Sequence, residues 1–313
     1  MKISVLVCTY NRCSSLKDTL VSLQNQIIPK EAGFDYEVVI ADNNSNDGTK
    51  DVVEYYKPIF NGRLRYIFEP KQGKSFALNT AVKAAHGGIL ALTDDDVIVS
   101  KDWLFSIFNA FKNTNADCVG GRIYPNWNVV LPCWFSEKLY GRLALLDYGS
   151  KSFQIKPGDD YDLFGANYAF KKYCFDKFGF FRTDLCRKGN KLFSGEDAVY
   201  VKSILKKGAK VVYDPTLIVN HKIEKDRVRK SYFRRWHFYM GISKTFDDSG
   251  AHVLVKKSVF DIPRYLIRDF LETTVKYLKF TFSGNKKEQF FNECRLIFYC
   301  SYFMTKIKLK IKS

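Results

Sequence analysis

The sequence predicts an α/β fold with a mostly parallel central sheet covered by helices on both faces. Strand-like and helix-like segments alternate over the first 125 residues, as they do in chains built from βα units. The strand-like segments are apolar throughout, which indicates strands that are buried on both faces. Polar loops follow three of them, at the strand ends where ligands bind in sheets of this kind.

The predicted strands are residues 3–7, 37–41, 64–68, 89–93 and 118–123, and the predicted helices are residues 14–23, 49–56, 75–85 and 103–111. Residues 126–163 are less regular, and we expect a variable loop or short helices there. The segment GANYAF at 165–170 should return the chain to the sheet. A helix capped by Ser194 and a further strand follow it. Beyond Asn220 the pattern is helical to the end.

Positive charge is concentrated in the C-terminal third of the chain. The formal net charge is +17, and residues 222–313 contain 21 Lys or Arg against 9 Asp or Glu. Such a region indicates an anionic partner, either a membrane surface or nucleic acid. The segment RVRKSYFRRWHFYMG at 227–241 interleaves cations with aromatic rings, which suits both partners. Cations beside a broad apolar helix face favour anionic lipid; packing on the core or a homodimer contact is the alternative.

Cysteine usage and the N-terminal segment favour a cytoplasmic location. The eight cysteines form no C-x-x-C pair and no zinc-like spacing, so we expect free thiols in a reducing compartment. The first residues, MKISVLVCTYNR, lack the apolar core and cleavage site of a signal peptide. No stretch reaches the ~18 apolar residues of a membrane span. We therefore expect a cytoplasmic protein that is at most peripheral on the inner face of the cell membrane.

Two common nucleotide-binding signatures are missing from the sequence. The first strand-to-helix turn, CTYNRCSS, has no G-x-G-x-x-G, and no GxxxxGK[ST] occurs. A nicotinamide dehydrogenase and a P-loop NTPase are therefore disfavoured. A different kind of site is indicated by Asp94, Asp95 and Asp96, which end a buried strand. A divalent cation often uses one or two carboxylates together with substrate phosphates, although a solvated acidic turn would also explain the triplet.

Five motifs follow one another along the chain at informative spacings. They are CTYNR after the first strand, ADNNSNDGT after the second, QGKS before the third helix, TDDD after the fourth strand and GED near residue 195. In this order they resemble glycosyltransferase family 2, whose members are inverting nucleotide-sugar transferases with the GT-A fold. The resemblance implies a catalytic domain at 1–225, with a nucleotide-binding half at about 1–125 and an acceptor-binding half at about 126–225. A helical basic region at 226–313 would lie outside it.

The resemblance implies contacts with the nucleoside of the donor. Thr9, Tyr10 and Arg12 match the loop that lines the base. Asp42 matches the carboxylate that accepts a hydrogen bond from uracil, which favours a UDP-sugar. The usual text at that point is D-D-G-S, and this chain has D-N-N-S, so the neighbouring contacts must differ. An Asx-turn at Asp42 is the alternative.

The resemblance also implies contacts with the diphosphate and the sugar. Lys74 of QGKS would reach a phosphate or the sugar, and Asp94 and Asp95 match the ribose-side and sugar-side acids. Asp96 matches the ligand of a Mg²⁺ or Mn²⁺ ion that anchors the diphosphate. His221, which ends YDPTLIVNH, matches a late histidine that completes the metal site. A surface lysine and a hydrogen-bonded histidine are the alternatives.

The acceptor side is implied by residues further along the chain. Glu196 and Asp197 of SGEDAVY match an acidic pair in which the aspartate is the general base and the glutamate orients the acceptor. Acids at a helix N-terminus are also ordinary helix stabilisers. Gly165 and Asn167 of GANYAF match the stretch beside the sugar and the acceptor. Trp134 is a candidate for stacking on an acceptor ring, with a core tryptophan as the alternative.

Together these residues predict an inverting, metal-dependent transfer of a sugar from a nucleoside-diphosphate sugar to a hydroxyl of a glycan or lipid-linked acceptor. Surface polysaccharide biosynthesis is the expected setting. A nucleotidyltransferase on a similar sheet is one alternative. A nucleic-acid-binding protein is another, supported by the basic region, but it would have no use for TDDD or GED. Nucleic acid is therefore the disfavoured partner.

Overall fold

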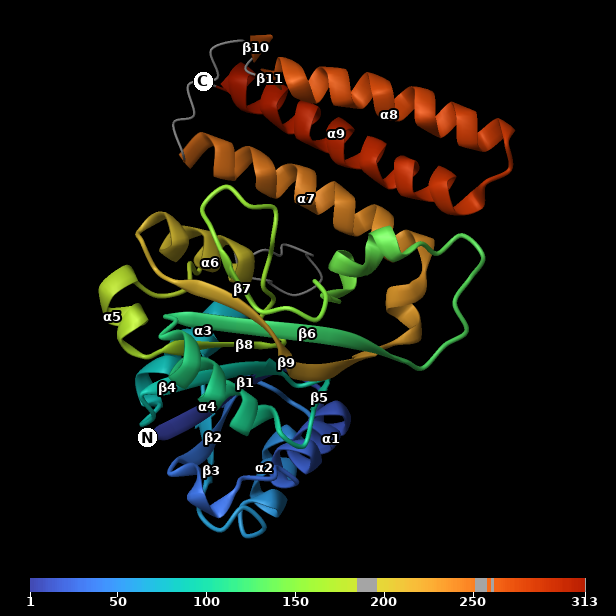
Figure 1. Ribbon diagram of the computed structural model, residues 1–313. Coiled ribbons are helices and arrows are strands. Elements are labelled where there is room, and N and C mark those ends of the chain that lie inside the picture. Colours follow the sequence, from blue (N-terminus) through green and yellow to red (C-terminus); the bar gives the residue numbers. More distant parts are fainter. Residues whose placement is uncertain (185–195, 251–257, 260–261, 313) are drawn as a thin grey trace. The chain divides into compact units, whose positions relative to one another are not determined.

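The computed structural model describes residues 1–184, 196–250, 258–259 and 262–312 (Figure 1). The chain forms two compact units. The first comprises Met1–Asn126, Ala144–Gly189 and Gly195–Lys222. The second comprises Trp127–Leu143, Asn190–Ser194 and Ile223–Ser313. The seven cysteines in the described part are free thiols, as predicted, and Cys186 lies outside it.

The parallel half of the sheet in the first unit comes from the N-terminal strands. These are β1 (Lys2–Thr9), β2 (Asp35–Asp42), β3 (Leu64–Phe68) and β4 (Ile89–Asp94). They lie in the order β3-β2-β1-β4 and every neighbouring pair is parallel. The register pairs Thr9 with Asp42 and Cys8 with Asp94. The carboxyl ends of β1, β2 and β4 are therefore level, and the polar loops that follow them start from the same edge.

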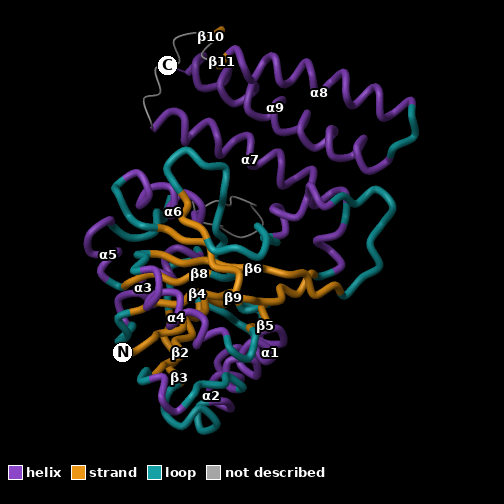
Figure 2. Tube along the Cα trace, viewed as in Figure 1, coloured by secondary structure: helices purple, strands orange, loops and turns teal. Residues whose placement is uncertain are grey.

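Helices connect these strands and cover the sheet (Figure 2). They are α1 (Cys13–Gln24), α2 (Thr49–Tyr56), α3 (Lys74–Ala84) and α4 (Trp103–Thr114), with a short 3₁₀ turn, η1 (Lys30–Ala32), before β2. All four lie within a few residues of the predicted helices. The central strands are almost wholly buried, with Val5, Val39 and Leu90 each 0% exposed. Strands that pack against helices on both faces are apolar throughout. The continuous apolar runs in the sequence therefore predicted these strands correctly.

The other half of the sheet is mixed in direction. Strand β8 (Tyr168–Lys171) lies between β4 and β6 (Cys118–Trp127) and is antiparallel to both, so β6 runs in the same direction as β4. Next to β6 is β9 (Val211–Ile223), which pairs with β5 (Val97–Val99) and β7 (Phe153–Ile155). The sequence analysis missed β5 and β7, because three-residue segments carry no periodic signal. Helices α5 (Tyr173–Phe178) and α6 (Glu196–Lys206) complete this unit.

The second unit is mainly helical. Its elements are η2 (Glu137–Leu143), η3 (Lys225–Val228), α7 (Lys230–Gly250), β10 (Ser258–Val259), β11 (Ile262–Pro263), α8 (Arg264–Phe282) and α9 (Lys286–Lys312). Helix α9 packs against both α7 and α8 (Figure 1). The prediction of a purely helical end was wrong in detail, because β9 runs to Ile223 and β10 pairs with β11.

Close packing inside the second unit depends on a glycine at the α7–α9 crossing. A Cβ atom on Gly241 would lie 2.4 Å from the carbonyl oxygen of Phe298, so only glycine lets the two backbones approach this closely.

None of the helices in the described part of the chain is both long enough and apolar enough to cross a membrane.

Candidate active site

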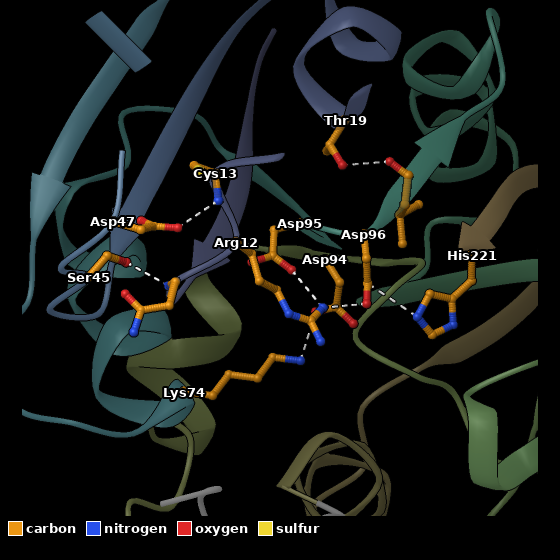
Figure 3. A network of polar contacts seen from close by, with 12 residues as sticks. Arg12, Cys13, Thr19, Ser45, Asp47, Lys74, Asp94, Asp95, Asp96 and His221 are labelled. Atoms are coloured by element: carbon orange, nitrogen blue, oxygen red, sulfur yellow. Dashed lines mark hydrogen bonds and ion pairs between the residues drawn. The ribbon is translucent and has the colours of Figure 1, made fainter. Parts of the chain in front are cut away.

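The three carboxylates that end β4 lie among positively charged and hydrogen-bonding side chains (Figure 3). Lys74 Nζ lies 2.8 Å from Asp94 Oδ1. One guanidinium nitrogen of Arg12 lies 3.2 Å from Asp95 Oδ1 and 2.5 Å from Asp96 Oδ2. These contacts offset the repulsion between neighbouring carboxylates. The triplet is therefore a built cluster, not a solvated turn.

The carboxylates differ in how well their charge is compensated. Burial raises the pKa of Asp95 to about 6, although the Arg12 guanidinium opposes that shift. Burial would also raise the pKa of Asp94, but the Lys74 ammonium outweighs it and the pKa is lowered. Asp95 and Asp96 are 5% and 2% exposed, so water screens them little. Burial therefore works against the charge of Asp95, and a further cation close to it would stabilise the cluster.

Asp96 and His221 are arranged like two neighbouring ligands of a divalent metal ion. Strand β5 pairs with β9 so that Val97 lies opposite His221, which brings His221 Nε2 to 3.2 Å from Asp96 Oδ1. Adjacent ligands of an octahedral ion with bonds of about 2.1 Å lie about 3 Å apart. An oxygen and an imidazole nitrogen are donors that Mn²⁺ and Mg²⁺ accept. These two residues therefore fit the predicted ion.

The protein supplies an incomplete coordination shell at this position. Within the part of the chain that the structure describes, no group of three or more His, Cys, Asp or Glu side chains is arranged to hold a metal ion. An ion held by Asp96 and His221 would need oxygens from elsewhere. Magnesium-type sites commonly take them from substrate phosphates and water. The arrangement suits an ion that binds together with a phosphate-bearing substrate.

Arg12 makes contacts that the sequence did not predict. The resemblance placed it in a loop that lines a nucleotide base, which stays a prediction, and in the structure its guanidinium contacts Asp95 and Asp96. The physical reason is that buried adjacent carboxylates need a cation, and Arg12 precedes α1 at the same sheet edge. The neighbouring residues differ: Thr9 is 3% exposed and Tyr10 is 44% exposed. Only Tyr10 of the predicted loop presents a large side chain to solvent.

Asp42 accepts hydrogen bonds from the protein itself at the end of β2. Its Oδ1 accepts from the Ser45 main-chain N–H at 2.9 Å, and its Oδ2 accepts from the Tyr66 hydroxyl at 2.7 Å. The local turn that competed with the uracil contact is therefore present. Burial and the Asp42 carboxylate raise the pKa of Tyr66, so the phenol remains a donor. Each carboxylate oxygen can accept a second bond, and the uracil contact stays a prediction.

The loops after β1 and β2 are bonded to each other, and sequence reasoning missed the residues that do this. Asn11 Oδ1 accepts from the Asn46 main-chain N–H at 2.8 Å, and Ser45 Oγ accepts from the Asn11 N–H at 2.9 Å. Asp47 accepts from the Cys13 N–H at 3.0 Å. Asn11 has φ 50°, a conformation that asparagine tolerates better than most residues. Asparagines clustered in two successive loops were the available signal.

Asn43 fixes the loop that carries Lys74, which is also a contact that sequence reasoning missed. Its amide nitrogen donates to the carbonyl of Lys71 at 2.7 Å, and its Oδ1 accepts from the Gly73 N–H at 2.7 Å. Asn43 is 4% exposed. This residue stands where the family usually has a second aspartate. Asparagine at this position therefore has a structural role. Its amide both donates to Lys71 and accepts from Gly73, whereas an ionised carboxylate could only accept.

Asn167 has its hydrogen-bonding groups committed inside the fold. Its amide nitrogen donates to the carbonyls of Arg122 at 2.8 Å and Leu217 at 2.9 Å. Its Oδ1 accepts from Trp103 Nε1 at 2.8 Å. The side chain ties β6, β9 and α4 together and is 1% exposed. Both amide hydrogens are therefore used, and a sugar hydroxyl could be met only through the second lone pair of Oδ1; the contact between Asn167 and the sugar stays a prediction.

The other residues predicted to contact the acceptor are Gly165, Glu196, Asp197 and Trp134. Gly165 is buried just before β8. Glu196 and Asp197 open α6, but their side chains, like residues 185–195, lie outside what the structure describes. Trp134 belongs to the second unit, where its ring lies 4.6 Å from that of Phe290. Its stacking on an acceptor ring stays a prediction.

Asn79 anchors the segment that precedes residues 185–195. Its amide nitrogen donates to the Phe181 carbonyl at 2.9 Å, and its Oδ1 accepts from the Phe181 N–H at 3.0 Å. This two-bond pairing joins α3, which begins with Lys74, to the chain on the way to α6. No local sequence signal indicates a contact between residues so far apart.

The fold and the site define an α/β protein with an acid-lined sheet edge that suits a phosphate-bearing substrate. A model of Glycosyl transferase family 2 matches residues 4–179, more than half of the 313 residues. The chain belongs to glycosyl transferase family 2. It is therefore an enzyme that uses nucleotide-sugar donors, and the predicted GT-A fold is confirmed.

Two relatives match most of the chain. It is 27% identical over 253 residues to a glucosyl-dolichyl phosphate glucuronosyltransferase of Haloferax volcanii, covering 79% of this chain and 78% of that protein. It is 25% identical over 243 residues to the succinoglycan biosynthesis protein ExoM of Rhizobium meliloti, covering 77% of this chain and 73% of that protein. Both names belong to the making of glycans.

Two solved structures share the fold. A mannosyltransferase from Pyrobaculum calidifontis in complex with GDP-Man and Mn²⁺ has a TM-score of 0.56 at 22% identity, covering 79% of this chain and 64% of that one. The S. aureus TarS 1–349 structure with UDP has a TM-score of 0.54 at 16% identity, covering 100% of this chain and 92% of that one. At these identities the likeness extends to the fold alone.

Proposed function

We propose that this chain transfers a sugar, with inversion, from a UDP-sugar to a hydroxyl of a lipid-linked glycan in a reaction that needs Mg²⁺ or Mn²⁺. The observation that carries the proposal is the placing of Asp96 Oδ1 3.2 Å from His221 Nε2, beside Asp94, Asp95 and Lys74. A buried acidic cluster with two metal-type donors and a lysine suits a metal-bound diphosphate.

Donor binding is assigned to the level strand ends of the first unit. Asp42, Thr9 and Tyr10 would meet the nucleoside, with Tyr10 offering an exposed ring. Asp94 and Asp95 would meet the ribose and the sugar. Lys74, held 2.8 Å from Asp94, would turn its ammonium to a phosphate oxygen as the donor binds. The resemblance assigned Arg12 to the base. Its contacts with Asp95 and Asp96 add a second role, in which the guanidinium would balance the charge of these two carboxylates.

The transfer itself requires one proton to move. The acceptor hydroxyl oxygen attacks the anomeric carbon from the face opposite the diphosphate. The bond from that carbon to the diphosphate oxygen breaks, and its electron pair leaves with the nucleoside diphosphate. Asp197 takes the hydroxyl proton as general base, and Glu196 orients the acceptor. A bound Mg²⁺ or Mn²⁺ stabilises the charge that develops on the leaving diphosphate. Gly165, with no side chain, would let the acceptor sugar approach the backbone.

The identity of the substrates is inferred from the named relatives. The Haloferax relative is named as acting on glucosyl-dolichyl phosphate, which supports a sugar carried on a lipid phosphate as the acceptor class. Three structural neighbours hold UDP or UDP-GlcNAc, and two hold Mn²⁺. These points support a UDP-sugar and a divalent ion.

A panel of nucleotide sugars tests this proposal. Purified protein is given each donor with and without Mn²⁺, with a short-chain polyprenyl-phosphate glycan as acceptor, and release of nucleoside diphosphate is measured. We expect Mn²⁺-dependent release from one UDP-sugar, lost in both Asp96→Asn and Asp197→Asn. Asp35→Asn, an exposed acid at the other end of β2, is the matched control and should be as active as wild type. Equal release by wild type and Asp96→Asn would overturn the assignment, as would binding of nucleic acid without binding of any nucleotide.

A further inference from the structure

Helix α8 carries two separate apolar faces, and the residues that the structure describes pack against only one of them. Leu266 is 6% exposed and packs with Tyr299 and Tyr302 of α9, together with Ile267 and Phe270. Four other apolar residues of α8 face solvent: Leu271 is 59% exposed, Val275 66%, Leu278 49% and Phe282 87%. The broad apolar face that the sequence suggested is therefore divided between packing on α9 and solvent.

The exposed residues form one continuous line along the helix, which we call the α8 stripe: Leu271, Val275, Leu278 and Phe282. Their spacings of four, three and four residues place them on a single face. Arg264 and Arg268 continue the same line toward the start of α8 and are exposed. A surface helix is usually polar on the side away from its packing partner. An apolar line there indicates a surface that contacts something else.

The surroundings of the stripe are strongly basic. Residues 264–312 contain eleven Lys or Arg and four Asp or Glu, a net charge of +7. All four acids take part in ion pairs: Asp269 and Glu272 with Arg268, Glu288 with Lys138, and Glu293 with Arg234. Exposed lysines flank the stripe and its end, at positions 276, 279, 286 and 287. The charge left over on this surface is positive.

We propose that the α8 stripe lies in the interface of a membrane that contains anionic lipids. Apolar side chains would enter the boundary between headgroups and acyl chains, and the flanking cations would contact lipid phosphates. Phe282, at the end of α8, is the deepest anchor because it is the most exposed of the four. No helix of the described residues is suited to crossing the membrane, so the contact is with its surface.

Charge complementarity favours lipid over a second copy of the chain. A symmetric dimer through the stripe would bring together two copies of residues 264–312, each with a net charge of +7. Like charges facing each other across an interface oppose association. An anionic bilayer removes that repulsion and covers the same apolar residues. This inference concerns a different surface from the sugar-transfer site and does not depend on it.

Co-sedimentation of the full chain with lipid vesicles tests the proposal. The vesicles are phosphatidylcholine alone, or phosphatidylcholine with phosphatidylglycerol. We expect binding to the mixed vesicles, and the double variant Leu271→Gln with Phe282→Gln should weaken it at least about tenfold, because two apolar anchors are lost. Lys276→Gln with Lys279→Gln should reduce the preference for anionic lipid. Tyr55→Gln, at a residue 70% exposed on α2, is the matched control and should bind as wild type does.

Two further measurements make the result decisive. Thermal unfolding of each variant confirms that it is folded, since substitutions on an exposed helix face should change stability little. Light scattering reports the oligomeric state. Vesicle binding that is equal in wild type and the stripe variant would overturn the proposal. So would a wild-type dimer that the stripe substitutions convert to a monomer without any change in vesicle binding.

Discussion

Buried or partly buried carboxylates lie at opposite ends of the parallel sheet, Glu37 at one end and Asp94, Asp95 and Asp96 at the other, and their charges are compensated very differently. At the amino end, the single carboxylate of Glu37 accepts from Ser4 Oγ at 2.6 Å, from the His86 N–H at 2.6 Å and from Arg65 at 3.0 Å. Burial alone would raise its pKa, but these bonds outweigh burial and lower the pKa of Glu37 to about 2. The negative charge of Glu37 is therefore well compensated by its hydrogen bonds and by Arg65.

At the carboxyl end, the three carboxylates share the cations Lys74 and Arg12, whereas Arg65 lies beside the single carboxylate of Glu37. Arg12 divides one nitrogen between Asp95 and Asp96, and the pKa of Asp95 is raised to about 6, chiefly by burial. The comparison teaches how to separate a structural cluster from a functional one. Complete compensation produces rigidity and stability, whereas incomplete compensation leaves a site that a bound cation or substrate can complete.

The largest effect is expected from Asp96→Asn. Replacing a proposed metal ligand should lower the rate of sugar transfer on the order of 10³-fold, because a metal ion supplies several kcal/mol of charge stabilisation in the transition state. Steady-state kinetics with saturating Mn²⁺ measures this. Thermal unfolding of the variant separates this loss of rate from any loss of stability that follows from removing a partner of Arg12. A rate within a few-fold of wild type would contradict the functional reading of this cluster.

The opposite pattern is expected from Glu37→Gln. Arg65 would lose its carboxylate partner and the buried hydrogen bonds would be weakened, so the free energy of unfolding should fall by about 3 kcal/mol. Urea denaturation measures it. The folded fraction should keep the wild-type turnover rate. Asp35→Asn, at an exposed position of the same strand, should change stability by less than about 0.5 kcal/mol. Comparable losses in both variants would contradict the comparison.

Acid should remove the stability that Glu37 contributes. Its folded-state pKa, about 2, lies below the ordinary value of 4.5, so that stability is present above pH 4.5 and is lost as pH falls toward 2. The shift corresponds to at most about 3 kcal/mol. Stability measured from pH 6 down to pH 2 should fall less in Glu37→Gln than in wild type over this window. Parallel curves for the two proteins would show that Glu37 titrates normally.

A smaller effect is expected from Asn43→Ala. This variant removes hydrogen bonds that hold the loop before Lys74, and it changes none of the three carboxylates. Losing the buried bonds to Lys71 and Gly73 should cost about 1–3 kcal/mol and loosen the loop that carries Lys74. We expect the KM for the donor to rise about tenfold, with a smaller change in kcat. Asn46→Ala, at an exposed position in the same loop, is the control. An unchanged KM would show that the loop holds its position without Asn43.

The sequence predicted the parts of the molecule that depend on local pattern. The parallel strands and their helices follow from apolar runs and turn residues. The acidic triplet indicated a site because neighbouring carboxylates at the end of a buried strand repel one another unless a cation or hydrogen bonds stabilise them. The prediction that His221 lies with Asp96 came from a family resemblance, and the pairing of β5 with β9 supplies its physical basis.

The parts that were missed depend on contacts between distant residues. The bonds of the Asn167 amide to Trp103, Arg122 and Leu217 were not predicted. Nor were the contacts of Arg12 with carboxylates 83 and 84 residues away. A side chain's partners depend on the completed fold, and no local pattern encodes them.

The most direct test of the central claim is calorimetric titration of UDP into wild type and Asp96→Asn, each with and without Mn²⁺. We predict that wild type binds UDP much more tightly when Mn²⁺ is present, because an ion held by Asp96 and His221 would attract the negative charge of the diphosphate. Asp96→Asn should bind UDP weakly and with no Mn²⁺ dependence. UDP binding that is equally tight in both proteins, or that ignores Mn²⁺ in wild type, would contradict the assignment of this cluster as the metal and diphosphate site.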